Sequence, residues 1–196
     1  MFKQLRKALG LNPQPAPPQG IVTPGQLALW AGAQRWAFAF DGEPDRFVLQ
    51  GRVVEHPWRL ESGAPSRDYM QGTELRVRAE LALSPDAHVM VISRALKDEL
   101  EGRVYGAITN SLQTTVNQSL PQEMRWLSIY EELRWPQMPS SFVRAFAVVG
   151  EDLDTARHWV NAALVSQLMR DQQQAPPGQV PLVLMVSDAS VSLRMQ

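Results

Sequence analysis

The stretch 74-ELRVRAELAL-83 decides the class of fold. Apolar and charged residues alternate along it without a break: Leu75, Val77, Ala79 and Leu81 are apolar, and Glu74, Arg76, Arg78 and Glu80 are charged. Successive side chains of a β-strand point to opposite faces of a sheet, so this pattern predicts a strand with one face against a core and the other toward water. Such half-exposed strands are typical of antiparallel sheets.

Further strands are predicted on both sides of this one. Runs rich in β-branched and aromatic residues, separated by residues that favour turns, lie at 36–40, 47–55, 58–62 and 88–93. Gly51 indicates either a β-bulge or a close approach of another group to the backbone. We expect His56-Pro57 to end the strand that contains Gly51, and 58–62 to pair with 67–71 around a turn.

Helical spacing takes over in the second half of the chain. Apolar residues recur every four positions at Leu96, Leu100, Val104, Ile108, Leu112 and Val116, which predicts a long helix. The pattern beyond it predicts a helix at 122–133, a loop at 135–141, a strand at 142–150, a helix from Asp154 and a terminal hairpin at 181–196 that turns near Asp188. Near the start of the chain, Thr23-Pro24 predicts a helix N-terminus, because threonine is a good N-cap and proline suits the first helical position.

This order of elements predicts an α+β fold with a mostly antiparallel sheet. About five N-terminal strands are followed by helices and then by a β-α-β-β C-terminal portion. The first half lacks the regular alternation of strands and helices that a doubly wound parallel sheet needs. We expect residues 21–196 to form a single domain, with two packed lobes, 21–93 and 94–196, as the alternative.

Residues 1–20 are expected to form an arm outside this domain. The apolar residues Phe2, Leu5 and Leu9 have helical spacing and alternate with the cations Lys3, Arg6 and Lys7. Four prolines in 12-NPQPAPPQG-20 favour an extended linker. The arm is either a solvated tail or a docking segment for a partner or a membrane surface.

Composition excludes several classes of function. The chain of 196 residues has a formal net charge of −1, which argues against a dedicated nucleic-acid binder. It contains no cysteine, so disulfides, thiolate metal sites and cysteine nucleophiles are excluded. No apolar run reaches the roughly 20 residues that span a bilayer, and the N-terminus does not resemble a secretory signal. We expect a cytoplasmic location, with peripheral contact at the inner membrane through residues 1–11 as a further hypothesis.

No motif in the sequence identifies a catalytic or cofactor site. The patterns of P-loops, dinucleotide-binding folds, zinc proteases, α/β-hydrolases and EF-hands are all missing. The three histidines, His56, His88 and His158, lie in different predicted elements without metal-ligand spacing. We therefore predict neither a cofactor nor a metal.

Five of the six tryptophans divide into two groups. Their positions in the predicted elements place Trp36, Trp58 and Trp159 in the core. Trp126 and Trp135 flank a proline-rich loop and are expected to be exposed, where aromatic platforms bind ligands.

The richest polar segment, 57-PWRLESGAPSRDY-69, supplies the candidate site. In the predicted strands Arg59 and Glu61 point away from the core, and Arg76 and Arg78 share that face. One interpretation is a set of cross-strand charge pairs on a solvated surface. The other is an arginine-bearing surface for an anionic ligand or acidic partner, since arginine makes two parallel bonds to a carboxylate or phosphate. The candidate binding residues are Arg59, Glu61, Arg67, Asp68, Tyr69, Arg76 and Arg78.

Four short motifs in this region carry a resemblance. Leu-x-Gly-Arg at 49–52, Pro-Trp-Arg-Leu-Glu at 57–61, Arg-Asp-Tyr at 67–69 and Glu-Leu-Arg at 74–76 together resemble a family of uncharacterised bacterial proteins with no assigned function. The resemblance covers residues 47–82. It implies a bacterial origin and nothing about chemistry.

These observations favour a non-catalytic module that acts through protein–protein contact, with a partner that the sequence does not identify. The alternative is an enzyme or a small anionic-ligand-binding protein that uses the Arg, Glu, Asp and Tyr residues of 59–69. Homo-oligomer formation is left open.

Overall fold

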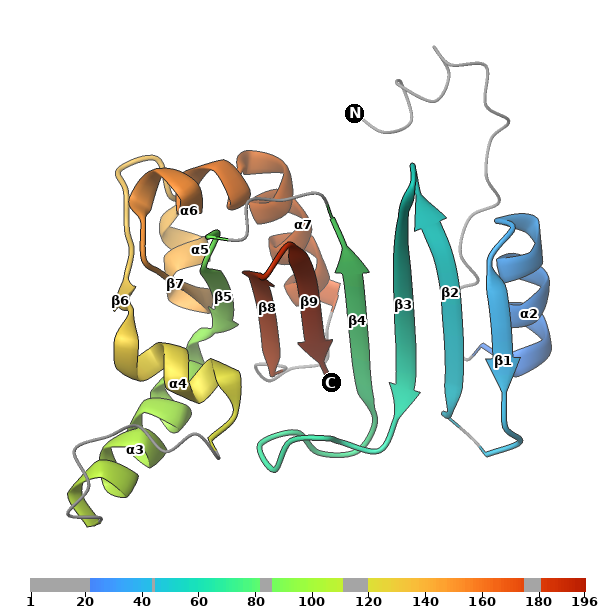
Figure 1. Cartoon of the computed structure of the whole chain (residues 1–196), viewed down its shortest axis with the longest axis horizontal. Helices are drawn as coiled ribbons and strands as arrows, with labels where there is room; N and C mark the ends of the chain where they lie inside the picture. The colour runs from blue at the N-terminus through green and yellow to red at the C-terminus, as the bar shows by residue number, and fades with distance from the viewer. Residues whose placement is uncertain (1–21, 44, 82–85, 111–119, 175–180) are drawn as a thin grey trace.

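A large antiparallel sheet organises the part of the chain that the computed structural model describes, namely residues 22–43, 45–81, 86–110, 120–174 and 181–196 (Figure 1). Its nine strands are β1 (Ala37–Phe40), β2 (Phe47–Val53), β3 (His56–Gly63), β4 (Glu74–Glu80), β5 (Val89–Ser93), β6 (Glu131–Glu132), β7 (Phe146–Gly150), β8 (Leu182–Ser187) and β9 (Ser190–Met195). They lie in the order β1-β2-β3-β4-β9-β8-β5-β7-β6, and every neighbouring pair is antiparallel. The predicted α+β class and antiparallel sheet are confirmed.

Six described helices flank this sheet: α2 (Pro24–Ala33), α3 (Arg94–Asn110), α4 (Gln122–Ile129), α5 (Ser140–Ala145), α6 (Leu153–Trp159) and α7 (Ala162–Gln174). We define the front face of the sheet as the one that carries Met90 and Ile92, which pack in one core cluster with residues of α3 and α4. The back face carries Val89 and Val91, which pack in a second cluster with residues of α5, α6 and α7. Figure 1 shows α7 behind β8 and β9, and α2 behind β1.

The helix predicted to begin at Thr23 is present, and its capping explains where it starts. The Thr23 hydroxyl accepts a hydrogen bond from the backbone amide of Gln26, and the Gln26 side chain accepts one from the amide of Thr23. This reciprocal capping box satisfies two amides that have no partner within the helix. The predicted arm and linker at 1–20 lie outside the described residues, so their role stays a prediction.

Three tryptophans tie α2 to the sheet at its outer edge. Trp36 makes edge-to-face contacts with Trp30 and Trp58, with ring centroids 5.0 and 4.8 Å apart. Gly51 lies directly opposite Trp58, and a Cβ atom there would lie 2.6 Å from Trp36 Cδ1 and 2.8 Å from Trp58 Cζ2. The close approach predicted from Gly51 is therefore confirmed, and the unbroken register of β2 with β3 shows no bulge.

The expected hairpin between 58–62 and 67–71 is wrong, because β3 pairs with β4 instead. Residues 64–73 form an irregular loop, in which Tyr69 and Met70 are buried against the front-face core. Packing of these two side chains in the core keeps the segment in the loop, and β4 occupies the place beside β3. The prediction that His56-Pro57 ends a strand is also wrong, since both residues open β3 after a tight turn.

Several boundaries in the second half also differ from the predictions. The helix expected at 122–133 ends at Ile129, which is 61% exposed, and the short strand β6 follows it. Residues 142–145 belong to α5 rather than to a strand, because Phe142 and Ala145 face the core one helical turn apart. The expected helix from Asp154 is two helices, since Asn161 caps α7 by accepting hydrogen bonds from the amides of Ala163 and Leu164.

The long helix is α3, and its predicted continuation through Leu112 and Val116 lies outside the described residues. No helix in the described ranges is long and apolar enough to cross a membrane.

The predicted C-terminal hairpin is confirmed and joins the two halves of the sheet. Asp188 and Ala189 have φ of 49° and 58°, as a two-residue turn between antiparallel strands requires. β9 pairs with β4 on one side and with β8 on the other. Whether the two halves act as one domain or as two packed lobes stays a prediction.

The contact between Gly51 and the two tryptophans generates a test of stability. We expect Gly51→Ala to lower the free energy of unfolding by about 2 kcal/mol, because the added methyl group overpacks a filled space. Gly102→Ala is the control: a Cβ there meets no atom within 4 Å, so it should be neutral or stabilising by up to about 1 kcal/mol. Urea unfolding checks both, and equal midpoints for Gly51→Ala and the wild type would contradict the packing argument.

Candidate functional site: an arginine groove beside helix α4

A groove of about 270 Å³ lies on the front face, where β3, β4 and β9 meet α4. Five arginines line it: Arg59, Arg67, Arg76, Arg78 and Arg194. We call this cavity the arginine groove. Glu61, Gln122 and Glu123 also contribute to its lining.

Strand register brings the arginines together. Arg59 of β3 lies directly opposite Arg78 of β4, and Arg76 of β4 lies directly opposite Arg194 of β9. Alternation along each strand puts all four side chains on the same face. Arg59, Glu61, Arg76 and Arg78 thus lie on one face of the sheet, as the sequence pattern predicted.

Glu61 is shared by two arginines of the groove. Its carboxylate lies 2.5 Å from Arg59 Nε and 3.3 Å from Arg76 Nη2. The hydrogen bond from Arg59, with the positive charges of Arg59 and Arg76, outweighs partial burial and lowers the pKa of Glu61 below its ordinary value. Glu61 therefore stays ionised and is a weak base.

Glu74 lies at the base of the arginine cluster and is fully buried. Its carboxylate accepts hydrogen bonds from the Ser66 amide at 2.6 Å, from Arg194 at 2.8 Å and from Arg76 at 3.4 Å. Burial alone would raise the pKa of Glu74, but the bonds from Ser66 and Arg194 outweigh it and lower this pKa. The sequence predicted a solvated Glu74, and that prediction is wrong because the loop 64–73 covers it.

A second buried carboxylate, Glu123 of α4, fixes the same loop at the other side of the groove. Arg67 Nε lies 2.6 Å from Glu123 Oε1, and the Tyr69 hydroxyl donates a hydrogen bond to the same oxygen. Burial, together with the charge of Glu123, raises the pKa of Tyr69 far above its ordinary value. Tyr69 is thus a structural donor beneath the groove.

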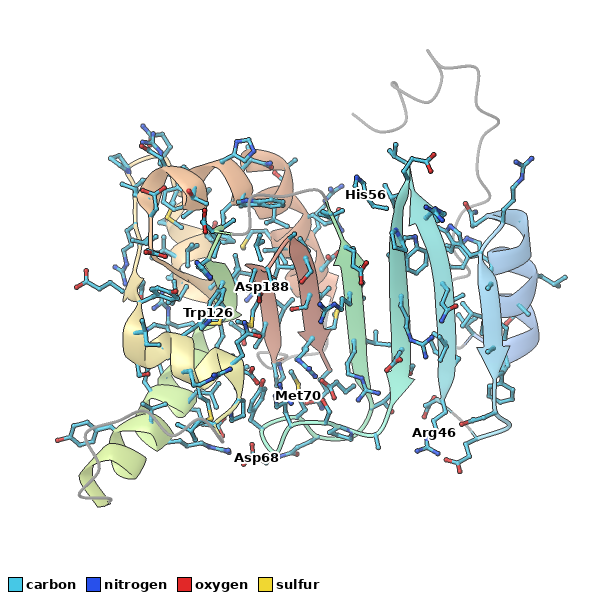
Figure 2. The ribbon with its side chains drawn as sticks, in the orientation of Figure 1. Arg46, His56, Asp68, Met70, Trp126 and Asp188 are labelled. Carbon is cyan, nitrogen blue, oxygen red and sulfur yellow. The ribbon has the colours of Figure 1, made fainter. Side chains whose placement is uncertain are left out.

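Two further predicted site residues, Asp68 and Arg78, have different surroundings. Asp68 does not line the groove: it forms an ion pair with Arg103 of α3 at 2.8 Å. Figure 2 shows Asp68 at the lower end of the sheet, on the loop that joins β3 to β4. Arg78 is exposed within the groove and makes no hydrogen bond or ion pair among the described residues.

Sequence reasoning missed Arg194 and Glu123. Arg194 alternates with the apolar residues Leu193 and Met195, a signal that could have placed it on a charged face. Glu123 gives no such signal, because its partner Arg67 lies 56 positions away in the chain. Only the packing of α4 against the loop 64–73 reveals it.

The histidines and tryptophans form no second site in the described ranges. His88 packs against Trp126 and Tyr130, with ring centroids 5.5 and 5.8 Å apart. Trp126 is buried, which corrects the prediction that it is exposed, because α4 turns it toward the front-face core. Trp135 is partly buried and packs on the back-face core. No group of three or more His, Cys, Asp or Glu residues in the described ranges is placed to hold a metal ion.

Comparison with known proteins finds one similarity. Over 149 residues the chain is 26% identical to a co-chaperone protein HscB homolog from Bordetella avium (strain 197N), and the match covers 72% of this chain and 84% of that protein. No family model matches the chain, and no solved structure matches it.

The bonding of Glu74 predicts a pH-dependent contribution to stability. A carboxylate whose pKa is lowered on folding stabilises the fold above its unfolded pKa, near 4.5, and this contribution is lost as the pH falls through the folded value. We expect Glu74→Gln to lower the free energy of unfolding by about 3 kcal/mol near pH 7, because Arg76 and Arg194 then face each other without a shared carboxylate. Below about pH 4.5 the difference from the wild type should shrink.

The control is Glu80→Gln, which removes an exposed carboxylate from the same strand and face. Urea unfolding across this pH range measures all three proteins. A constant gap between Glu74→Gln and the wild type at every pH would contradict the assigned role of the Glu74 charge.

Proposed function

We propose that the chain is a non-catalytic protein-binding adaptor and that the arginine groove is where its partner docks. The observation that carries this proposal is the convergence of Arg59, Arg67, Arg76, Arg78 and Arg194 on one surface groove. Arginine forms planar, paired hydrogen bonds and is enriched at the centres of protein interfaces.

The protonation chemistry of the groove supports binding over acid–base catalysis. The pKa values of Glu61 and Glu74 are lowered, so neither carboxylate is suited to accept a proton near neutral pH. The pKa of Tyr69 is raised, so its hydroxyl is a poor proton donor. The pKa values of catalytic groups are usually shifted toward the working pH, whereas the pKa values of Glu61, Glu74 and Tyr69 are shifted away from neutral pH.

The class of partner that we propose is a chaperone. The similar protein from Bordetella avium bears the name of a co-chaperone, and a co-chaperone acts together with a chaperone. Contact with another protein also fits the polar front face of β2, β3 and β4, which none of the described helices covers in Figure 1.

A second candidate function is the binding of a small anionic ligand, with or without chemistry upon it. The same five arginines favour it, since a guanidinium group forms two parallel hydrogen bonds with a carboxylate and with a phosphate alike.

Charge reversal in the groove tests the adaptor function. The full chain and the variant Arg59→Glu/Arg78→Glu are immobilised and exposed to a bacterial lysate, and bound proteins are quantified by mass spectrometry. We expect the wild type to retain a chaperone at least about tenfold better than the variant, because two reversed charges repel an acidic partner surface. Binding of the purified chaperone, measured by calorimetry, then confirms a direct contact.

The matched control is Arg157→Glu/Arg170→Glu, which reverses two exposed charges on α6 and α7, away from the groove. It should retain the chaperone as the wild type does. Retention of no chaperone by the wild type, or equal retention by all three proteins, would overturn the proposal.

A further inference from the structure

Two pairs of arginines face each other across the strands of the front face, and only the members of one pair both bind the same carboxylate. Like charges directly opposite on neighbouring strands destabilise a sheet. Between Arg76 and Arg194, the buried carboxylate of Glu74 accepts hydrogen bonds from both guanidinium groups. The negative charge of Glu74 thus offsets the repulsion between Arg76 and Arg194.

The other pair, Arg59 and Arg78, has no carboxylate of its own between its members. Glu61 binds Arg59 and Arg76, and its two oxygens are used in those contacts. Arg78 has no ion pair or hydrogen bond in the described part of the chain. An anion bound between Arg59 and Arg78 would reduce the repulsion between these two like charges.

We infer that Arg59 and Arg78 clasp a carboxylate side chain from an acidic segment of a protein partner, as Arg76 and Arg194 clasp Glu74. This inference rests on the proposed adaptor function and names the chemistry of the partner. The Glu74 site in the same sheet demonstrates that two cross-strand arginines on this face can hold one carboxylate.

The shape of the surface favours an extended segment over a single free anion. A second cavity of about 450 Å³ adjoins the arginine groove and shares Glu61 and Arg76 with it. Small residues on this face, Ala39 and Gly63, line this second cavity. Arg46, which also lines it, lies at the lower end of the sheet in Figure 2. The two cavities together form a trough that runs from α4 across the front face toward β1.

The charge of the groove favours isolated carboxylates over a run of phosphates. Glu61, Glu74 and Glu123 offset three of the arginine charges. A nucleic-acid backbone would bring several phosphates close to these carboxylates, and like charges repel. A peptide can place one carboxylate between Arg59 and Arg78 and leave its other side chains in water. One or two acidic side chains satisfy the charge that is left.

The test measures binding of a fluorescein-labelled hexaglutamate peptide to the full chain by fluorescence anisotropy at low salt. We expect Arg78→Gln to weaken binding about tenfold, the loss of roughly one charge-assisted contact. Arg78→Lys keeps the positive charge but loses the planar guanidinium group, so its affinity should lie between those of the wild type and Arg78→Gln. Arg52→Gln is the matched control, because Arg52 is exposed on β2 and lines neither cavity.

A stability measurement separates binding from folding. Because Arg78 opposes Arg59 and has no partner, Arg78→Gln should unfold at the same urea concentration as the wild type or a higher one. Equal affinity of Arg78→Gln and Arg52→Gln for hexaglutamate would overturn the inference. Displacement of the peptide by inorganic phosphate at equal charge concentration would overturn the acidic segment in favour of a simple anion site. A hexaglutamine peptide should not bind, because it has no carboxylates. Binding of hexaglutamine as tightly as hexaglutamate would overturn the inference that a carboxylate is recognised.

The outcomes for this inference and for the adaptor function are distinguishable. If hexaglutamate does not bind, yet capture of a chaperone depends on Arg59 and Arg78, the acidic segment is wrong and the adaptor function stands. If hexaglutamate binds in an Arg78-dependent way and no chaperone is captured, the carboxylate clasp stands and the chaperone partner is wrong.

Discussion

The buried carboxylate of Glu74 is the interaction on which the rest of the front face depends. It joins its own strand β4 to Ser66, eight positions earlier in the preceding loop, and to Arg194 on the C-terminal strand β9, 120 positions later. A fully buried charge is costly unless it is paired and hydrogen-bonded, and Glu74 is both. Movement of Ser66 or Arg194 would therefore leave the buried Glu74 carboxylate without a partner or expose it to water.

From this anchor the geometry of the groove follows. With Ser66 bonded to Glu74, the next residues of the loop turn toward α4, where Arg67 and Tyr69 meet Glu123. Two buried carboxylates thus hold the two ends of one short loop segment. Strand register places the surface arginines, and these ion pairs hold Arg67, Arg76 and Arg194, so the groove is ordered without a bound partner.

Some of this was accessible from residue patterns alone. Alternation in 74–81 gave the correct face for Arg76 and Arg78, the capping signal at Thr23 gave the start of α2, and Gly51 marked a close approach of aromatic rings. These features are local: each depends on the period of a strand or the space around one residue. The misplaced strand at 67–71 and the misread helix boundary after Asp154 show the limit, because tertiary packing and a single capping residue, Asn161, overrode the local pattern.

By itself, the sequence determined the class of fold, the side of the sheet on which the arginines lie and the absence of cysteine chemistry. Tertiary structure alone decided that Glu74 and Glu123 are buried partners rather than solvated charges, that Arg194 joins the cluster, and that Arg78 is left unpaired. The reason is physical: parity along a strand assigns a side chain to a face, but which loop or helix covers that face is a long-range property. The Arg67–Glu123 and Glu74–Arg194 pairs span 56 and 120 positions, and no local period encodes them.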